Sequence, residues 1–212
     1  MKNVLITGGA GFIGFNLTKR LIDCGYNITI LDNLSKKIHS SNIKYTKLKD
    51  ITHFIIGDVC NRADWEKAIC NQDVIIHLAA ETGTGQSMYD IHNYTNVNVG
   101  ATAMMLDVLT NSKNSVKKII LSSSRAVYGE GMYKCKDQGV IFPSFRNDKD
   151  LQDGKYDFIS QNSKSKLIPI ATKENSHILP TSIYALTKYN QEQILLLCLL
   201  YTSPSPRDLT AS

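Results

Sequence analysis

The feature that most constrains the fold is a glycine-rich turn near the start of the chain. It lies between an apolar run, Val4–Thr7, typical of a buried strand, and residues 12–24, which carry apolar side chains at helical spacing. The turn itself is residues 8–14, Gly-Gly-Ala-Gly-Phe-Ile-Gly, and Gly25 ends the helical pattern as a helix stop would. A strand, a tight turn and a helix in this order predict the start of a β-α-β unit.

Short apolar runs and longer amphipathic stretches continue to alternate through the first half of the chain. Further strands are predicted at residues 27–31, 53–56, 74–78 and 118–122, and further helices at residues 62–70 and 94–109. The strands are apolar nearly throughout, as expected where helices cover both faces of a sheet. The sequence therefore predicts an α/β fold, a Rossmann-like doubly wound parallel sheet.

The pattern changes in the second half. Residues 131–180 are rich in Lys, Asp, Ser and Asn and have no sustained period, so we expect a long insertion with one short hairpin. Regular structure resumes at residues 181–197, which predict an amphipathic helix. We expect one domain, residues 1–197, interrupted by this insertion.

Composition narrows the function classes. The 212 residues are 42% hydrophobic and 20% charged with a net charge of +5, which is typical of a globular chain and not of a disordered, fibrous or membrane-spanning one. The five cysteines are scattered, which argues against a disulfide framework and favours a reducing compartment. The basic residues are dispersed, so no nucleic-acid partner is expected. No secretory leader is apparent, and the longest apolar stretch is shorter than the roughly 20 residues of a membrane span, so we expect a cytoplasmic protein without a membrane partner.

The glycine turn also indicates a ligand. Its glycines let the backbone approach a pyrophosphate, and the following helix N-terminus offers N–H groups and partial positive charge, although a purely structural turn is the alternative. Asp32 ends the second strand, 18 residues after Gly14, where a carboxylate accepts hydrogen bonds from ribose hydroxyls and favours NAD over NADP. Asp58, after the third strand, could receive the adenine amino group or instead cap the next helix; the sequence leaves both open.

A Tyr, a Lys and a Ser form the candidate catalytic set. Tyr184 and Lys188 lie one helical turn apart, and a neighbouring cation favours a phenolate, which can act as acid or base. Such pairs also occur on solvated helices without a function. Ser124 follows the fifth strand, at the sheet edge where ligands bind, and its hydroxyl could reach a substrate oxygen.

Together these residues resemble the extended short-chain dehydrogenase/reductase family, in its NAD-dependent epimerase/dehydratase group of nucleotide-sugar enzymes. Residues 7–14 are similar to its TGGxGxIG turn, residues 77–80 to its cofactor-lining strand end and residues 184–188 to its Tyr-x-x-x-Lys pair. The resemblance spans residues 2–197. It implies NAD as cofactor and Ser124, Tyr184 and Lys188 as catalytic residues. The cofactor-binding residues that it implies are Gly8, Gly11, Phe12, Ile13, Gly14, Asp32, Asn33, Asp58, Val59, Leu78, Ala79, Ala80, Tyr184 and Lys188.

The residues after Ser124 favour one reaction within the family. The 4,6-dehydratases have an Asp-Glu pair there that handles the eliminated water, whereas this chain has Arg125-Ala126. Residues 81–88 and 125–131 resemble 4-epimerases of dTDP- or UDP-hexoses. The resemblance thus implies hydride transfer from sugar C4 to NAD while Tyr184 takes the hydroxyl proton, then return of the hydride to the other face of the 4-keto sugar. A dehydratase or reductase, an NAD sensor without turnover and a non-functional fragment are the alternatives.

Two further expectations concern residues outside this set. His77 is expected to be a packed strand residue and not a catalytic base. Some relatives carry a cysteine knuckle in the insertion, but Cys135 stands alone in this chain, so no metal site is expected.

The C-terminus departs from the family pattern. Residues 198–208 resemble a translated transposase-type sequencing adapter, so we expect 198–212 to be an artefactual tail and the chain to lack the substrate-binding C-terminal region and to be inactive alone. The parent protein is expected to be a homodimer that takes a nucleotide-diphosphate hexose.

Overall fold

Five short apolar runs form one wholly parallel sheet with the strand order β3-β2-β1-β4-β5. The computed structural model describes residues 2–39 and 43–202. All five predicted strands are present, which confirms the Rossmann-like sheet. They are β1 (Asn3–Thr7), β2 (Asn27–Asp32), β3 (His53–Ile56), β4 (Val74–His77) and β5 (Lys118–Leu121).

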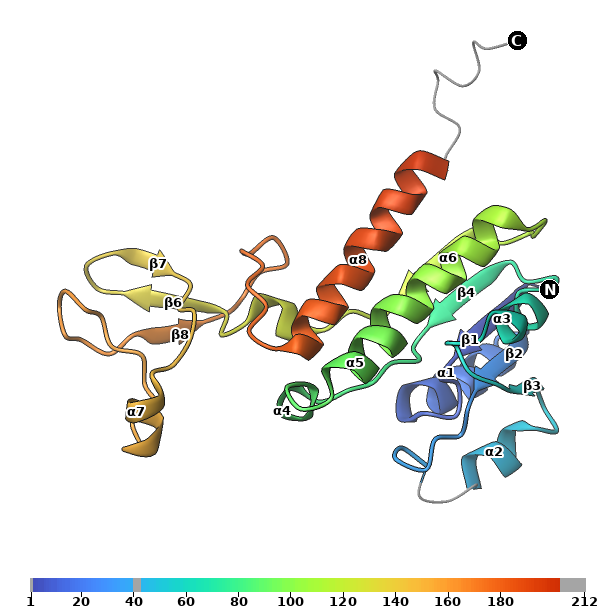
Figure 1. The fold of residues 1–212 in the computed structure, drawn as a ribbon, viewed down its shortest axis with the longest axis horizontal. Helices are drawn as coiled ribbons and strands as arrows, with labels where there is room; N and C mark the ends of the chain where they lie inside the picture. The colour runs from blue at the N-terminus through green and yellow to red at the C-terminus, as the bar shows by residue number, and fades with distance from the viewer. Residues whose placement is uncertain (1, 40–42, 203–212) are drawn as a thin grey trace, which may run out of the picture.

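Helices cover both faces of this sheet. Alternate strand residues point to opposite faces, so Leu5 packs with Trp65 and Met105 on one side, while Ile6 packs with Leu21 and Leu48 on the other. Figure 1 shows the two longest C-terminal helices, α6 and α8, lying side by side. The helices are α1 (Phe12–Asp23), α2 (Ile43–Leu48), α3 (Arg62–Ala68), α4 (Thr84–Ser87), α5 (Ile91–Tyr94), α6 (Ala101–Asn111) and α8 (Ile183–Thr202).

Two predicted helices differ by more than two residues from the structure in their limits. The helix expected at 94–109 is divided into α5, a π-helical turn η1 (Thr95–Gly100) and α6. The helix expected to end at residue 197 continues as α8 to Thr202; the rest of the predicted tail, residues 203–212, lies outside the described residues. No helix among the described residues is long and apolar enough to cross a membrane.

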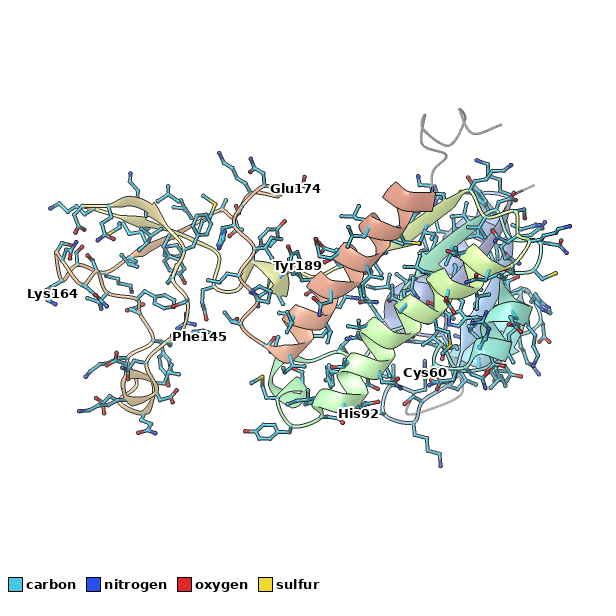
Figure 2. All side chains as sticks on the ribbon, turned by 45° about the horizontal axis from the view of Figure 1, so that its top comes forward. Cys60, His92, Phe145, Lys164, Glu174 and Tyr189 are labelled. Atoms are coloured by element: carbon cyan, nitrogen blue, oxygen red, sulfur yellow. The ribbon has the colours of Figure 1, made fainter. Side chains whose placement is uncertain are left out.

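Residues 131–180, here called the arm, stand away from the parallel sheet (Figure 1). They form a three-stranded antiparallel sheet of order β7-β6-β8. The expected hairpin is present as β6 and β7, and β8 adds a third strand that was not expected. It pairs with β6 across more than thirty residues, and local pattern does not reveal such a pairing. In Figure 2 the labelled Phe145 and Lys164 lie on the arm, far from Cys60 and His92. The arm contains β6 (Met132–Cys135), β7 (Gly139–Ile141), α7 (Asp148–Gln152) and β8 (Ile168–Ile170).

Candidate active site

The glycine turn between β1 and α1 leaves no room for side chains. A Cβ on Gly14 would lie 2.4 Å from the Gly8 carbonyl oxygen, and one on Gly8, whose φ is +68°, would lie 2.8 Å from the Ala79 nitrogen. The turn is closed by the Gly11 N–H, which donates to the Gly8 carbonyl at 3.0 Å. No side chain caps α1, so its first N–H groups face the space above the turn. This arrangement suits a phosphate group approaching the backbone.

Asp32 is buried beside this turn and orients it. One carboxylate oxygen accepts from the Ala10 N–H at 2.9 Å, and the other accepts from the Leu34 N–H at 2.9 Å. The His39 Nε2 lies 3.3 Å from the second oxygen. A carboxylate has about four lone-pair sites, so these contacts leave capacity for hydroxyl donors such as those of a ribose.

The structure excludes one of the two readings of Asp58. Helix α3 is capped by Asn61, whose side-chain oxygen accepts from the Ala63 N–H at 2.9 Å, so the reading of Asp58 as the helix cap was wrong. Asp58 accepts instead from the Cys60 N–H at 2.8 Å and from the Asn33 amide at 3.1 Å. It lies on the wall of the cavity described next.

A cavity of about 480 Å³ opens along the carboxyl edge of the sheet. Its lining includes all fourteen residues predicted to bind a cofactor, from the glycine turn, from the ends of β2, β3 and β4, and from α8. Other lining residues were not predicted, because loop side chains follow no period and the π-helical turn η1, which carries Val97, has no distinct signature. They are Ser35, Ile38, His39, Glu81, Thr82 and Val97.

Ser124 is not part of that lining, whereas Ser122 and Ser123 are. The Ser124 hydroxyl oxygen accepts from the Ala126 N–H at 3.1 Å and so caps the short 3₁₀ turn η2 (Arg125–Tyr128). This contact uses a lone pair and leaves the hydroxyl proton free to be donated. The catalytic role of Ser124 stays a prediction.

Helix α8 brings Tyr184 and Lys188 to the cavity wall. The Tyr184 N–H donates to the Ser87 hydroxyl at 3.0 Å, which fixes the start of the helix, and its ring meets that of Tyr94 edge-on at 6.4 Å. Lys188 is buried, and its Nζ donates to the Gln191 Oε1 at 2.6 Å. Burial lowers the pKa of Lys188 to about 8, against an opposing effect of Glu192.

His77, at the end of β4, is fully enclosed, which confirms the expectation of a packed residue. Its Nδ1 lies 2.7 Å from the Thr7 hydroxyl and its Nε2 lies 3.3 Å from that of Thr102. Burial, and then the positive charge of Lys188, lowers the pKa of His77 to about 3. The imidazole is therefore neutral at physiological pH.

Comparison with known proteins identifies the family. The model described as "NAD dependent epimerase/dehydratase family" matches residues 4–151. The chain belongs to this family. Among curated relatives, a dTDP-L-rhamnose 4-epimerase of Burkholderia thailandensis is 34% identical over 196 residues, which are 92% of this chain and 53% of the relative. A bifunctional UDP-glucose 4-epimerase and UDP-xylose 4-epimerase of Pisum sativum is 31% identical over 136 residues, covering 61% of this chain and 38% of the relative.

Solved structures of epimerases share the fold. A UDP-glucose 4-epimerase from Brucella ovis in complex with NAD is 28% identical with a TM-score of 0.65, covering 94% of this chain and 48% of that one. A UDP-N-acetylglucosamine 4-epimerase from Methanobrevibacter ruminantium M1 is 29% identical with a TM-score of 0.64, covering 92% and 50%. This member of the epimerase/dehydratase family thus spans about half the length of the relatives that match most of it.

NAD is the cofactor of the family, and the cavity residues fit it. The side-chain-free surface at Gly8 and Gly14 gives a pyrophosphate access to backbone N–H groups. The buried Asp32 carboxylate at the end of β2 suits an unphosphorylated ribose, because a 2′-phosphate there would bring two negative charges together.

Proposed function

We propose that this chain is the NAD-binding part of a nucleotide-sugar 4-epimerase. The observation that supports this most is that Tyr184 and Lys188 line the same cavity as the glycine turn and Asp32. The names of the relatives agree, since the curated ones above are 4-epimerases of dTDP- or UDP-sugars. In this proposal residues 1–197 form the cofactor domain, the arm is an insertion, and a region beyond them completes the pocket for a nucleotide-diphosphate hexose.

In this proposal Tyr184, Lys188 and Ser124 have separate roles in the reaction. The glycine turn and Asp32 would hold NAD, which would supply reversible hydride transfer at C4 of the sugar. Tyr184, as the phenolate, takes the proton of the 4-hydroxyl and later returns it. The Lys188 ammonium, one helical turn away, favours that phenolate. Ser124 orients the 4-hydroxyl with the proton that its capping contact leaves free.

The carboxylates of the cavity favour epimerization over dehydration. Elimination of water needs an acid and a base beside the reacting carbons, and the two residues after Ser124 are Arg125 and Ala126. Glu81, a carboxylate on the wall near Tyr94, is already paired with Lys37 at 2.6 Å. Asp32 and Asp58 accept backbone N–H groups of the cofactor loops.

The test uses Tyr184→Phe in a full-length protein carrying residues 1–197, assayed for 4-epimerization of dTDP- and UDP-hexoses. We expect kcat to fall by about a hundredfold or more, the range of one acid–base group, while NAD stays bound. Tyr189→Phe, one residue beyond Lys188 on α8, is the matched control and should keep its activity. Full activity of the Tyr184 variant would contradict the proposed function.

A further inference from the structure

A chain of buried polar side chains joins Lys188 to the sheet. Beyond Lys188, the Gln191 Nε2 donates to the Thr102 hydroxyl at 2.6 Å. Thr102, on α6, donates to the Asn98 carbonyl at 2.7 Å and lies 3.3 Å from the His77 Nε2. Gln191, Thr102 and His77 are all inaccessible to solvent, so each polar group depends on its protein partners.

The direction of these hydrogen bonds follows from the donors available. The single hydroxyl hydrogen of Thr102 goes to the Asn98 carbonyl, so Thr102 presents only lone pairs to its other neighbours. The amide nitrogen of Gln191 must therefore face Thr102. Its oxygen must face Lys188, because a flipped amide would place NH₂ against an ammonium and a carbonyl against a lone pair.

The other end of the network requires the same polarity. The Thr7 hydroxyl accepts from the Leu78 and Ala79 N–H groups, each at 3.2 Å, and so donates its hydrogen to the His77 Nδ1. His77 then carries its hydrogen on Nε2 and donates to Thr102. Every donor and acceptor from the end of β4 to Gln191 has one consistent role.

We propose that Gln191 is a positioning residue that holds the Lys188 ammonium at the cavity wall and sets how readily it carries its charge. The inference rests on the proposed function, in which that charge favours the Tyr184 phenolate. Gln191 itself does not line the cavity, so in this proposal it acts through Lys188.

Among the groups around the Lys188 ammonium, Gln191 is the contact through which we expect a substitution to change the pKa of Lys188. On α8 itself, Glu192 raises the pKa of Lys188 and Tyr184 lies one turn before it. From β4 comes His77, which is neutral at physiological pH. Within the described structure, α6 and η1 bring only the uncharged Thr102 and Asn98 to the network.

Two substitutions at this position make the inference testable, because they should move the pKa of Lys188 in opposite directions. Gln191→Met keeps the length of the side chain but removes the acceptor, so the buried ammonium loses its partner and the pKa falls below the wild-type value of about 8. Gln191→Glu places a carboxylate against the ammonium, so the pKa rises. We expect each shift in the pKa of Lys188 to be about one unit. At a pH below the pKa, this changes the neutral fraction of the amine about tenfold.

The measurement is competitive labelling of amines with acetic anhydride over a pH series, with the peptide carrying Lys188 followed by mass spectrometry. Lys188 lines the cavity but is only 4% exposed, so its pKa is read from the pH dependence of the labelling rate and not from the absolute rate. Gln193→Met, two residues further along α8, is the matched control and should leave the titration of Lys188 unchanged.

Opposite shifts in the two Gln191 variants would support the inference. A role limited to helix packing would instead expose Lys188 to water in both variants and raise its pKa in both, and that result, or any other pattern, would overturn it. The labelling is carried out without NAD, so its outcome is independent of the proposed function, which the Tyr184→Phe assay tests separately.

Discussion

The buried imidazole of His77 makes the stability of the folded chain depend on pH. His77 has a pKa of about 3 in the folded chain and an ordinary value of 6.5. Between these values the unfolded chain binds one more proton than the folded chain, so lowering the pH favours unfolding. The stability that the neutral imidazole contributes is fully present above pH 6.5 and is lost as the pH falls toward 3.

Replacement of His77 by Gln removes this titration. We expect the free energy of unfolding of the wild type to fall more steeply below pH 6.5 than that of His77→Gln, by up to about 1.4 kcal/mol per pH unit. Urea unfolding at several pH values measures both slopes. The exposed His53 gives the control, His53→Gln, which should keep the wild-type slope. Parallel slopes for the wild type and His77→Gln would refute the assignment of a buried neutral imidazole.

The site residues that could be predicted from the sequence are those whose position follows from spacing along the chain. Asp32 was found because it ends the second strand at a set distance from the glycine turn, and Lys188 because it lies one turn from Tyr184. Gln191 and Ser87 were not found, because their partners Thr102 and Tyr184 lie 89 and 97 residues away. A buried Gln on a helix has the same sequence signature as an exposed one.

Elements were predictable where they are apolar and regular. The five parallel strands were found because helices cover both faces and leave continuous apolar runs. The short helix α2 and the strand β8 were missed, since six and three residues give too few repeats to show a period. The π-helical turn η1 also has no distinct sequence signature, because it differs from an α-helix only in its hydrogen bonding.

The turn from β1 into α1 gives a prediction at this scale. In Gly14→Ala the added Cβ would lie 2.4 Å from the Gly8 carbonyl oxygen, so the turn must open. We expect the affinity for NAD⁺ to fall at least about tenfold and the free energy of unfolding to fall by about 1–3 kcal/mol, as in overpacked cores. Calorimetric titration and thermal unfolding measure these effects.

Gly85→Ala is the matched control for that change. A Cβ on Gly85 meets nothing within 4 Å, and its φ is not positive, so the variant should bind NAD⁺ as the wild type does. An undiminished affinity in Gly14→Ala would show that the turn does not need its close backbone packing.

At the scale of the whole molecule, the arm is built as a separate unit. Its strands pair with one another, and its interior is held by contacts such as the edge-on rings of Tyr133 and Phe158 and the Arg146 guanidinium over Phe158. The two ends of the arm meet, since the Met132 N–H donates to the Thr172 hydroxyl at 3.2 Å. The parallel sheet and its helices should therefore fold without most of the arm.

Excision of residues 132–171, with two glycines joining Gly131 to Thr172, tests this separation. We expect one cooperative thermal transition with a midpoint within about 4 °C of the wild type, the shift that about 1 kcal/mol produces in a chain of this size. Excision of residues 132–179 should cost more, because it removes the Leu179 N–H that donates to the Val127 carbonyl at 3.0 Å. Loss of the transition in the shorter excision would mean that the arm supports the sheet.

The contact between Ser87 and the start of α8 has a consequence for biosynthesis. The groups that place Tyr184 and Lys188 reach back to residues made about a hundred positions earlier, among them Ser87 and Thr102. On a ribosome the glycine turn and the strands around it can therefore assemble before α8 emerges. A nascent chain would first acquire the cradle for a dinucleotide, and α8, translated later, would then bring Tyr184 and Lys188 to its wall.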